Sequence, residues 1–455
     1  MHIFTLSSRS WISSSAKAME STTMNPGVDG SDDPNSTRLP LLLNPVYART
    51  KSTVFDELRN FRVCLKWCAL DHSTAAGRAV SYAAFVALAL LVPAATSLSV
   101  RAPPTASSSA SSVSFHKLVQ VPASSLAAIS FLTLAAFFRR YGLRQLLFLG
   151  GALRDDTTFV RRCYARELDR SFRHLVYILL PSFSVELAHK ILFFSTVSVA
   201  FPLSTVPSGV PWNSIAFVAT LASWVYRTGV FLLVCVLFRL TCELQILRFE
   251  GFYKTFDEGD GSHCQAIFRE HMRIKGQLLV TSHRYRIFIL GCLVTISASQ
   301  LGALTIVLAS KSKKNFCNSG DVVVCSAVQL SGFFMCLLGA ARITHRAQRV
   351  VSIASRWHMT LSSAADRKAD PPTPAVAESG DISDSGSPEG SVGSSVPHAQ
   401  ASTFEGRHAL VLYLQHNGGG ITLFGFALDR GLLHTLFAFE TTLVLWILSK
   451  VVVLS

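Results

Sequence analysis

Seven long apolar stretches constrain this 455-residue chain more than any other feature of its sequence. A helix needs about 20 apolar residues to cross the hydrocarbon layer of a bilayer, and each stretch reaches that length. The mean hydropathy of +0.37 agrees with this reading. We therefore expect an all-α membrane protein with seven transmembrane helices, at residues 79–100, 119–138, 175–202, 211–238, 287–310, 322–343 and 432–451.

The basic residues between these stretches predict how the chain is oriented in the membrane. Of the 42 Lys and Arg residues, 34 lie in segments 1–78, 139–174, 239–286 and 342–431, and six lie in the alternate connections. Loops rich in Lys and Arg stay in the cytosol, so we place the N-terminus in the cytosol and the C-terminus outside. Seven-helix G-protein-coupled receptors have the opposite orientation. The net charge of +14 lies beside the spans, where it can meet anionic lipid, and does not indicate nucleic-acid binding.

Composition and helical periodicity divide the chain into four parts. Residues 1–52 are polar and are predicted to be a disordered tail. Residues 53–361 are predicted to hold an amphipathic helix and transmembrane helices 1–6, with long extensions of helices 4–6 that form a cytosolic helical bundle. Residues 362–403 are predicted to be a disordered linker. Residues 404–455 are predicted to hold a split seventh helix, with a cytosolic piece, a Gly-rich hinge and the last transmembrane helix.

Ionisable residues inside the spans are the first candidates for function, since charge at that depth is costly. Span three contains Glu186, His189 and Lys190, and span four contains Arg227. Both Glu186 and Arg227 lie roughly 22–24 Å below the outer end of their helices at about 1.5 Å per residue, so we expect a buried ion pair. Lys190, one turn from Glu186, can share it. Two interpretations stay open: the network fixes helix register without touching a ligand, or Lys190 and His189 line a ligand pocket.

A second candidate site lies in the last span, where Glu440 is followed by Thr441. In an oligomer with the seventh helix at its axis, Glu440 would form an acidic ring, and such rings attract cations into a pore. The alternative is a glutamate paired with a neighbouring helix, and the sequence favours neither.

The chain lacks the motifs of soluble enzymes. Gly418-Gly419-Gly420 is not followed by Lys-Ser/Thr, so it indicates a turn and not a phosphate-binding loop. The histidines are scattered and the cysteines have no zinc spacing. We expect no catalytic residues, metal or cofactor. Cys317 and Cys325 lie near the outer face, but their spacing alone does not fix a disulfide.

Several short motifs resemble one family of uncharacterised seven-span membrane proteins of plants, often labelled extracellular ligand-gated ion channel proteins. The resemblance covers about residues 53–450, apart from the linker. The motifs are Phe55-Asp56-Glu57-Leu58-Arg59, Arg140-Tyr141-Gly142-Leu143-Arg144, Ser223-Trp224-Val225-Tyr226-Arg227, Leu237-Phe238-Arg239-Leu240, Ser282-His283-Arg284, Thr344-His345-Arg346-Ala347-Gln348 and Leu428-Asp429-Arg430.

That plant family is in turn distantly similar to insect gustatory and odorant receptors. The resemblance implies a homotetrameric ligand-gated cation channel in the plasma membrane, rather than an endomembrane, with an unknown small-molecule ligand. One departure is clear: the last span reads Leu436-Phe437-Ala438-Phe439-Glu440-Thr441-Thr442, without the residue pairs that mark the insect pore helix. We therefore keep an alternative, a non-conducting membrane receptor or scaffold that acts through its cytosolic helical bundle.

Overall fold

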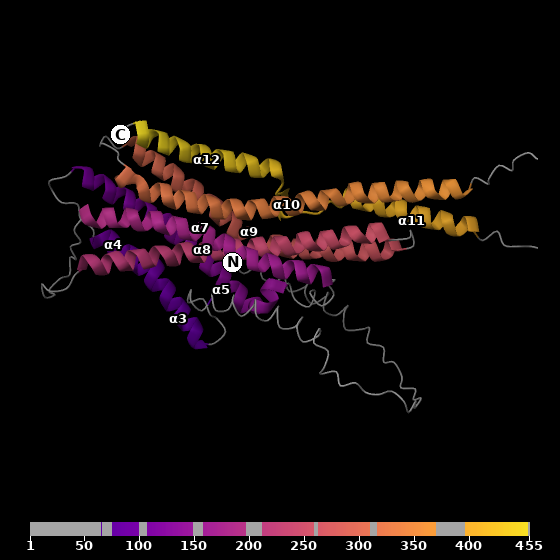
Figure 1. Cartoon of the computed structure of the whole chain (residues 1–455), viewed down its shortest axis with the longest axis horizontal. Helices are drawn as coiled ribbons and strands as arrows, with labels where there is room; N and C mark the ends of the chain where they lie inside the picture. Colours follow the sequence, from indigo (N-terminus) through magenta and orange to yellow (C-terminus); the bar gives the residue numbers. More distant parts are fainter. Residues whose placement is uncertain are drawn as a thin grey trace, which may run out of the picture. The chain divides into compact units, whose positions relative to one another are not determined.

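The structure is a computed structural model (Figure 1), and it describes residues 65, 75–99, 107–148, 158–196, 212–258, 263–309, 316–369 and 396–453. The chain divides into two units, Met1–Ser52 and Thr53–Ser455, and every described residue belongs to the second. The predicted N-terminal tail therefore lies outside the described residues. The same holds for the predicted amphipathic helix at 54–68, apart from Leu65.

The described part is helical except for one small hairpin. The first span combines three segments, because Pro93 cannot donate a backbone hydrogen bond and its ring displaces the carbonyl four residues earlier. The helix widens into a π turn just before it. The elements are α3 (Ala75–Phe85), η2 (Val86–Leu91), α4 (Val92–Ser99), α5 (Ser107–Phe148), α7 (Thr158–Thr196), α8 (Trp212–Glu258), α9 (Cys264–Ala309), α10 (Phe316–Ala369), α11 (Val396–His416), β1 (Thr422–Leu423), β2 (Phe426–Ala427) and α12 (Arg430–Val453).

Seven of the described helices are long and apolar enough to cross a membrane, which confirms a multi-pass membrane protein. Helices α8, α9 and α10 have 47, 46 and 54 residues, more than twice what a span needs, as predicted for helices 4–6. Helices α5 and α7, with 42 and 39 residues, are extended as well, which the sequence analysis did not predict.

Helix α8 forms the centre of the packing. Of its most apolar 18-residue window, 89% is buried, against 17–67% for the other six spans. Its most extensive contacts are with α10, α7 and α5. Two glycines of α10 allow the approach: a Cβ on Gly332 would lie 2.7 Å from Phe231, and one on Gly339 would lie 3.3 Å from Cys242. Small residues commonly let membrane helices pack this closely.

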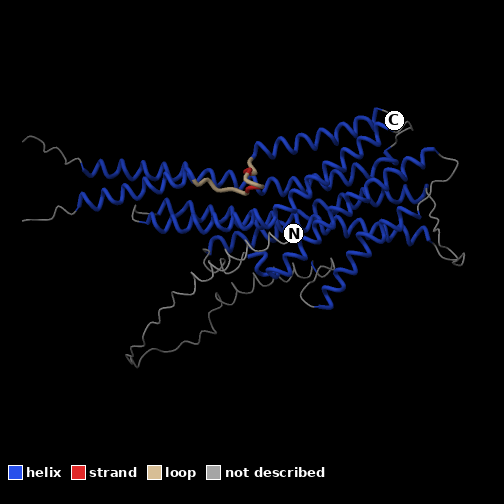
Figure 2. Tube along the Cα trace, turned by 180° about the vertical axis from the view of Figure 1, so that it is seen from behind, coloured by secondary structure: helices blue, strands red, loops and turns tan. Residues whose placement is uncertain are grey.

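The seventh element is split, as predicted, but its two helices are joined by a hairpin (Figure 2). Strands β1 and β2 pair in antiparallel register, with Thr422 opposite Ala427. The two turn residues, Phe424 and Gly425, have φ values of 51° and 94°, as a tight hairpin turn requires. Helix α11 packs on α9 and α10 to one side of the hairpin, and α12 packs on the same two helices to the other (Figure 1).

The hairpin is docked on α9. The Thr422 backbone N–H donates to the Ser282 hydroxyl at 2.8 Å, and Lys275 donates to the Asn417 side chain at 2.8 Å. The Arg286 guanidinium lies 4.7 Å from the centre of the Phe424 ring. The junction therefore holds the last span to the extended helices through polar and cation–π contacts.

The helix boundaries bear on the predicted linker at 362–403 and on Cys317 and Cys325. Helix α10 continues to Ala369 and α11 begins at Val396, so helix occupies both ends of the predicted linker. Cys317 and Cys325 lie on the same helix, and eight residues correspond to about 12 Å of rise.

Candidate functional site

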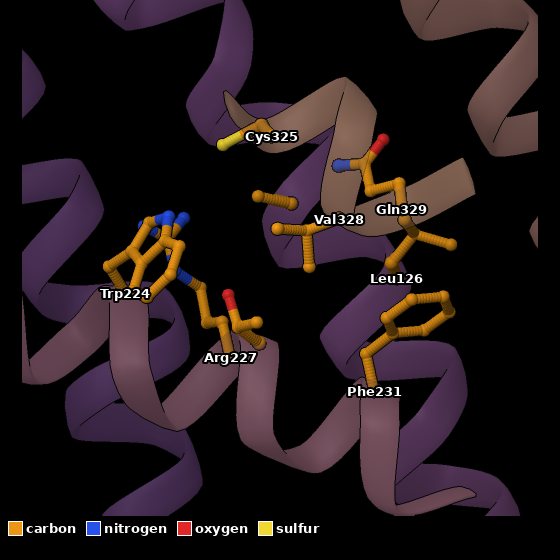
Figure 3. Close-up of a pocket in the computed structure, with 9 residues that line it drawn as sticks. Leu126, Trp224, Arg227, Phe231, Cys325, Val328 and Gln329 are labelled. Atoms are coloured by element: carbon orange, nitrogen blue, oxygen red, sulfur yellow. The ribbon is translucent and has the colours of Figure 1, made fainter. Parts of the chain in front are cut away.

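A cavity opens between α5, α8 and α10 within the membrane-spanning part of the chain. It has a volume of about 360 Å³, counting the space at its mouth. Figure 3 shows Trp224, Arg227 and Phe231 on α8 facing Cys325, Val328 and Gln329 on α10, with Leu126 of α5 beside them. The remaining lining residues are Ala123 and Thr228.

A smaller cavity of about 230 Å³ adjoins the first and extends it to α7. The two cavities share Trp224, Arg227 and Cys325. The smaller one adds Glu186 and Lys190 from α7, Gln120 from α5 and Thr220 from α8. Four spans therefore meet around one polar centre with an apolar extension.

The charged residues of this centre are almost completely buried. The Lys190 ammonium lies 3.4 Å from the Glu186 carboxylate, one helical turn apart on α7, and both side chains are at most 2% exposed. Arg227, 4% exposed, donates to the Gln120 backbone carbonyl at 3.4 Å and to the Ser124 hydroxyl at 3.3 Å. Burial of such charges is tolerable only with these partners close by.

The structure thus brings three of the four predicted residues together. Glu186, Lys190 and Arg227 all line the smaller cavity. The direct ion pair between Glu186 and Arg227 stays a prediction. His189 is buried on α7, 5% exposed, and is not among the described residues that line either cavity.

Trp224 is a member of this site that the charge-based reasoning missed. Its indole is 4% exposed and lines both cavities. Its Nε1–H has no hydrogen-bond partner among the described residues. Buried polar groups are normally paired, so this indole N–H is a donor available to an acceptor group inside the cavity. In the sequence Trp224 looks like one more aromatic residue of an apolar span.

The second candidate site has a different geometry from the predicted acidic ring. Glu440 is 1% exposed and accepts a hydrogen bond from Ser297 of α9. With its amide turned to donate, Gln300 reaches the Glu440 carboxylate at 3.2 Å. The Thr441 hydroxyl donates to the Phe437 carbonyl of its own helix at 2.6 Å. Within the chain, Glu440 therefore links α12 to α9, which agrees with the alternative of a paired glutamate. Its role in a pore stays a prediction.

Among the described residues, no group of three or more His, Cys, Asp or Glu side chains is arranged to hold a metal ion.

Comparison with known proteins identifies the family. Residues 56–439 match the family described as "Protein of unknown function (DUF3537)". The chain belongs to this family. No curated protein matches the DUF3537 chain at a significant level.

Two solved structures are similar to this DUF3537 chain. One is the insect olfactory receptor OR5 from Machilis hrabei, with a TM-score of 0.49 and 12% identity, covering 83% of this chain and 90% of the receptor. The other is the same receptor in complex with eugenol, with a TM-score of 0.48 and 11% identity, covering 83% and 91%.

Proposed function

We propose that this DUF3537 protein is a membrane receptor that binds a small molecule in the cavity between α5, α7, α8 and α10. The observation that carries the proposal is the polar centre of Glu186, Lys190 and Arg227, buried within the spans beside an apolar cavity. Ionisable groups inside membrane spans are expensive to keep there and usually serve a ligand or ion. An apolar cavity with a few convergent polar groups is also typical of small-molecule sites.

The finer part of the proposal is a ligand-gated cation channel, formed as a homotetramer in the plasma membrane with the N-terminus in the cytosol. The motif resemblance supports it, because the plant family named from those motifs and the family matched over residues 56–439 are, we infer, the same. The distribution of Lys and Arg supports the orientation.

Ion pairs on the extended helices indicate that this part of the chain lies outside the bilayer. Arg346 of α10 lies 3.1 Å from Glu250 of α8, and Arg342 of α10 lies 3.4 Å from Glu243 of α8. Exposed charge pairs of this kind belong in water rather than in lipid. The bundle that they join would therefore project from the bilayer on the side rich in Lys and Arg.

A second candidate function is a non-conducting receptor or scaffold that acts through this cytosolic bundle. Two observations favour it. Glu440 is buried against α9, where it cannot line a pore without a rearrangement of α12. The last span also departs from the insect receptors' pore helix.

Reconstitution separates the two functions. The purified protein would be placed in planar bilayers between K⁺ and Na⁺ solutions, and its mass would be measured by native mass spectrometry. A tetramer with cation current, whose selectivity changes in Glu440→Gln, is expected for the channel. Gln300→Ala is the matched control, because it removes a neighbour of Glu440 and keeps the carboxylate. A monomer that stays silent with a panel of aromatic acids, alcohols and amines would refute the channel and favour the scaffold.

A further inference from the structure

We propose that the cavity binds a small organic anion, a monocarboxylate with an apolar body, whose carboxylate meets Arg227 and Trp224 and whose body packs against the apolar residues between α5, α8 and α10. The inference deepens the proposed receptor function, on which it rests for its physiological meaning. Binding itself can be tested without any channel activity.

The charge balance of the site favours an anion. The residues that line the two cavities include two cations, Lys190 and Arg227, and among the described lining residues Glu186 is the acid that faces them. Arg227 stays protonated at any physiological pH, because a guanidinium does not lose its proton in proteins. Among the described lining residues the cations outnumber the acid by one, and a bound anion would balance that count in a region where net charge is unfavourable. A cationic ligand would double the excess.

The hydrogen-bonding capacity of the site also favours an anion. The Trp224 indole N–H can only donate, and it has no partner among the described residues. Arg227 offers several further donors in a planar fork, which matches the geometry of a carboxylate. Both side chains project from α8 and line both cavities, so one acceptor group can meet them together.

The rest of the cavity favours an apolar body of limited size. Leu126, Phe231 and Val328 line its larger part, and Phe231 is 3% exposed. Much of the volume of about 360 Å³ is open space at the mouth, so the enclosed part has room for only a small group. A single ring with one carboxylate fits this description better than a lipid or a peptide.

Three planar probes of matched shape test the inference: benzoate, neutral benzamide and cationic benzamidinium. Binding to the full-length protein in nanodiscs would be measured by isothermal titration calorimetry, in sulfate buffer so that neither chloride nor a second carboxylate competes. We expect benzoate to bind and benzamide to bind at least about 10-fold more weakly, because it lacks the charge-assisted hydrogen bonds. Benzamidinium should not bind.

Variants assign the effect to the site. Trp224→Phe keeps an aromatic side chain and removes the N–H, and should weaken benzoate binding by about 10-fold. Arg227→Gln should abolish it. Arg342→Gln, which removes a half-exposed arginine outside the lining of both cavities, is the control and should bind as the natural protein does. Arg227→Gln removes a buried charge and can impair folding. If it does not elute as a folded protein, the milder Trp224→Phe variant is used to test the site.

Four results would overturn the inference: no benzoate binding, equal binding of benzamide, unchanged binding in Trp224→Phe, or stabilisation by chloride with nothing added by benzoate. The last result would assign the excess charge to an inorganic ion. Benzoate binding without any current would leave the inference standing and refute the channel. Current evoked by a neutral probe, without benzoate binding, would refute the inference and leave the receptor function.

Discussion

Replacing Gly332 with alanine tests the close packing of α10 on α8. The new Cβ would lie 2.7 Å from one carbon of the Phe231 ring and 3.0 Å from a Leu232 methyl. Carbon atoms pack at about 3.5–4.0 Å, so the ring must move by about 1 Å. Phe231 and Leu232 are at most 3% exposed and cannot turn outward. Overpacking of this kind costs about 1–3 kcal/mol.

Gly229→Ala is the matched control for this substitution. Gly229 lies on α8, and a Cβ there meets nothing within 4 Å. Both substitutions gain helix propensity, up to about 1 kcal/mol, because glycine is poor in helix interiors. The difference between the two variants therefore isolates the packing term.

The measurement is unfolding in detergent micelles, followed by tryptophan fluorescence as the temperature or the SDS content rises. Gly332→Ala should unfold earlier than Gly229→Ala, by an amount equivalent to about 1–3 kcal/mol. Because Phe231 lines the cavity, Gly332→Ala should also weaken binding of any ligand there. Equal stability of the two variants would refute the packing argument.

Three further predictions concern other parts of the chain. Glu186→Gln leaves the Lys190 ammonium without its carboxylate and should cost about 3–5 kcal/mol in the same unfolding assay; Glu167→Gln, which breaks the exposed pair with Arg170, should cost at most about 1 kcal/mol, and equal effects would contradict the buried pair. Ser282→Ala removes the acceptor of the hairpin N–H and should speed hydrogen exchange across residues 421–428, whereas unchanged exchange would show that the hairpin holds without it. The sequon at Asn35 should stay unglycosylated in cells, while a sequon introduced into the connection at 203–210 should be modified, and the reverse result would invert the orientation.

Local patterns of the sequence were sufficient to predict the helical architecture. Length and hydropathy located the seven spans, and helical periodicity beyond them predicted the extensions of α8, α9 and α10. The extensions of α5 and α7, near 139–148 and 158–174, were missed although the second has an apolar face: Val160, Tyr164 and Leu168 recur every four residues and are buried.

The features that the sequence did not reveal depend on neighbours in space. The hairpin is two residues per strand, and its turn places a non-glycine residue, Phe424, at positive φ, which no local pattern indicates. The sequence was sufficient to bring Glu186 and Arg227 to the same cavity, because the depth of a residue in the membrane follows from its position along the helix. The direction in which Glu440 and Trp224 face around their helices depends on what α9 and α10 present to them.

The uninterrupted course of α8 has a mechanical consequence. The same helix that carries Arg227 in the cavity continues to Glu258 without a break, a run of about 46 Å. A rod of that length acts as a lever: a tilt of about 5° at the cavity would sweep its far tip through about 4 Å. A small tilt of α8 caused by a ligand in the cavity would therefore displace any group that contacts the far end of the helix, and no hinge is needed in between.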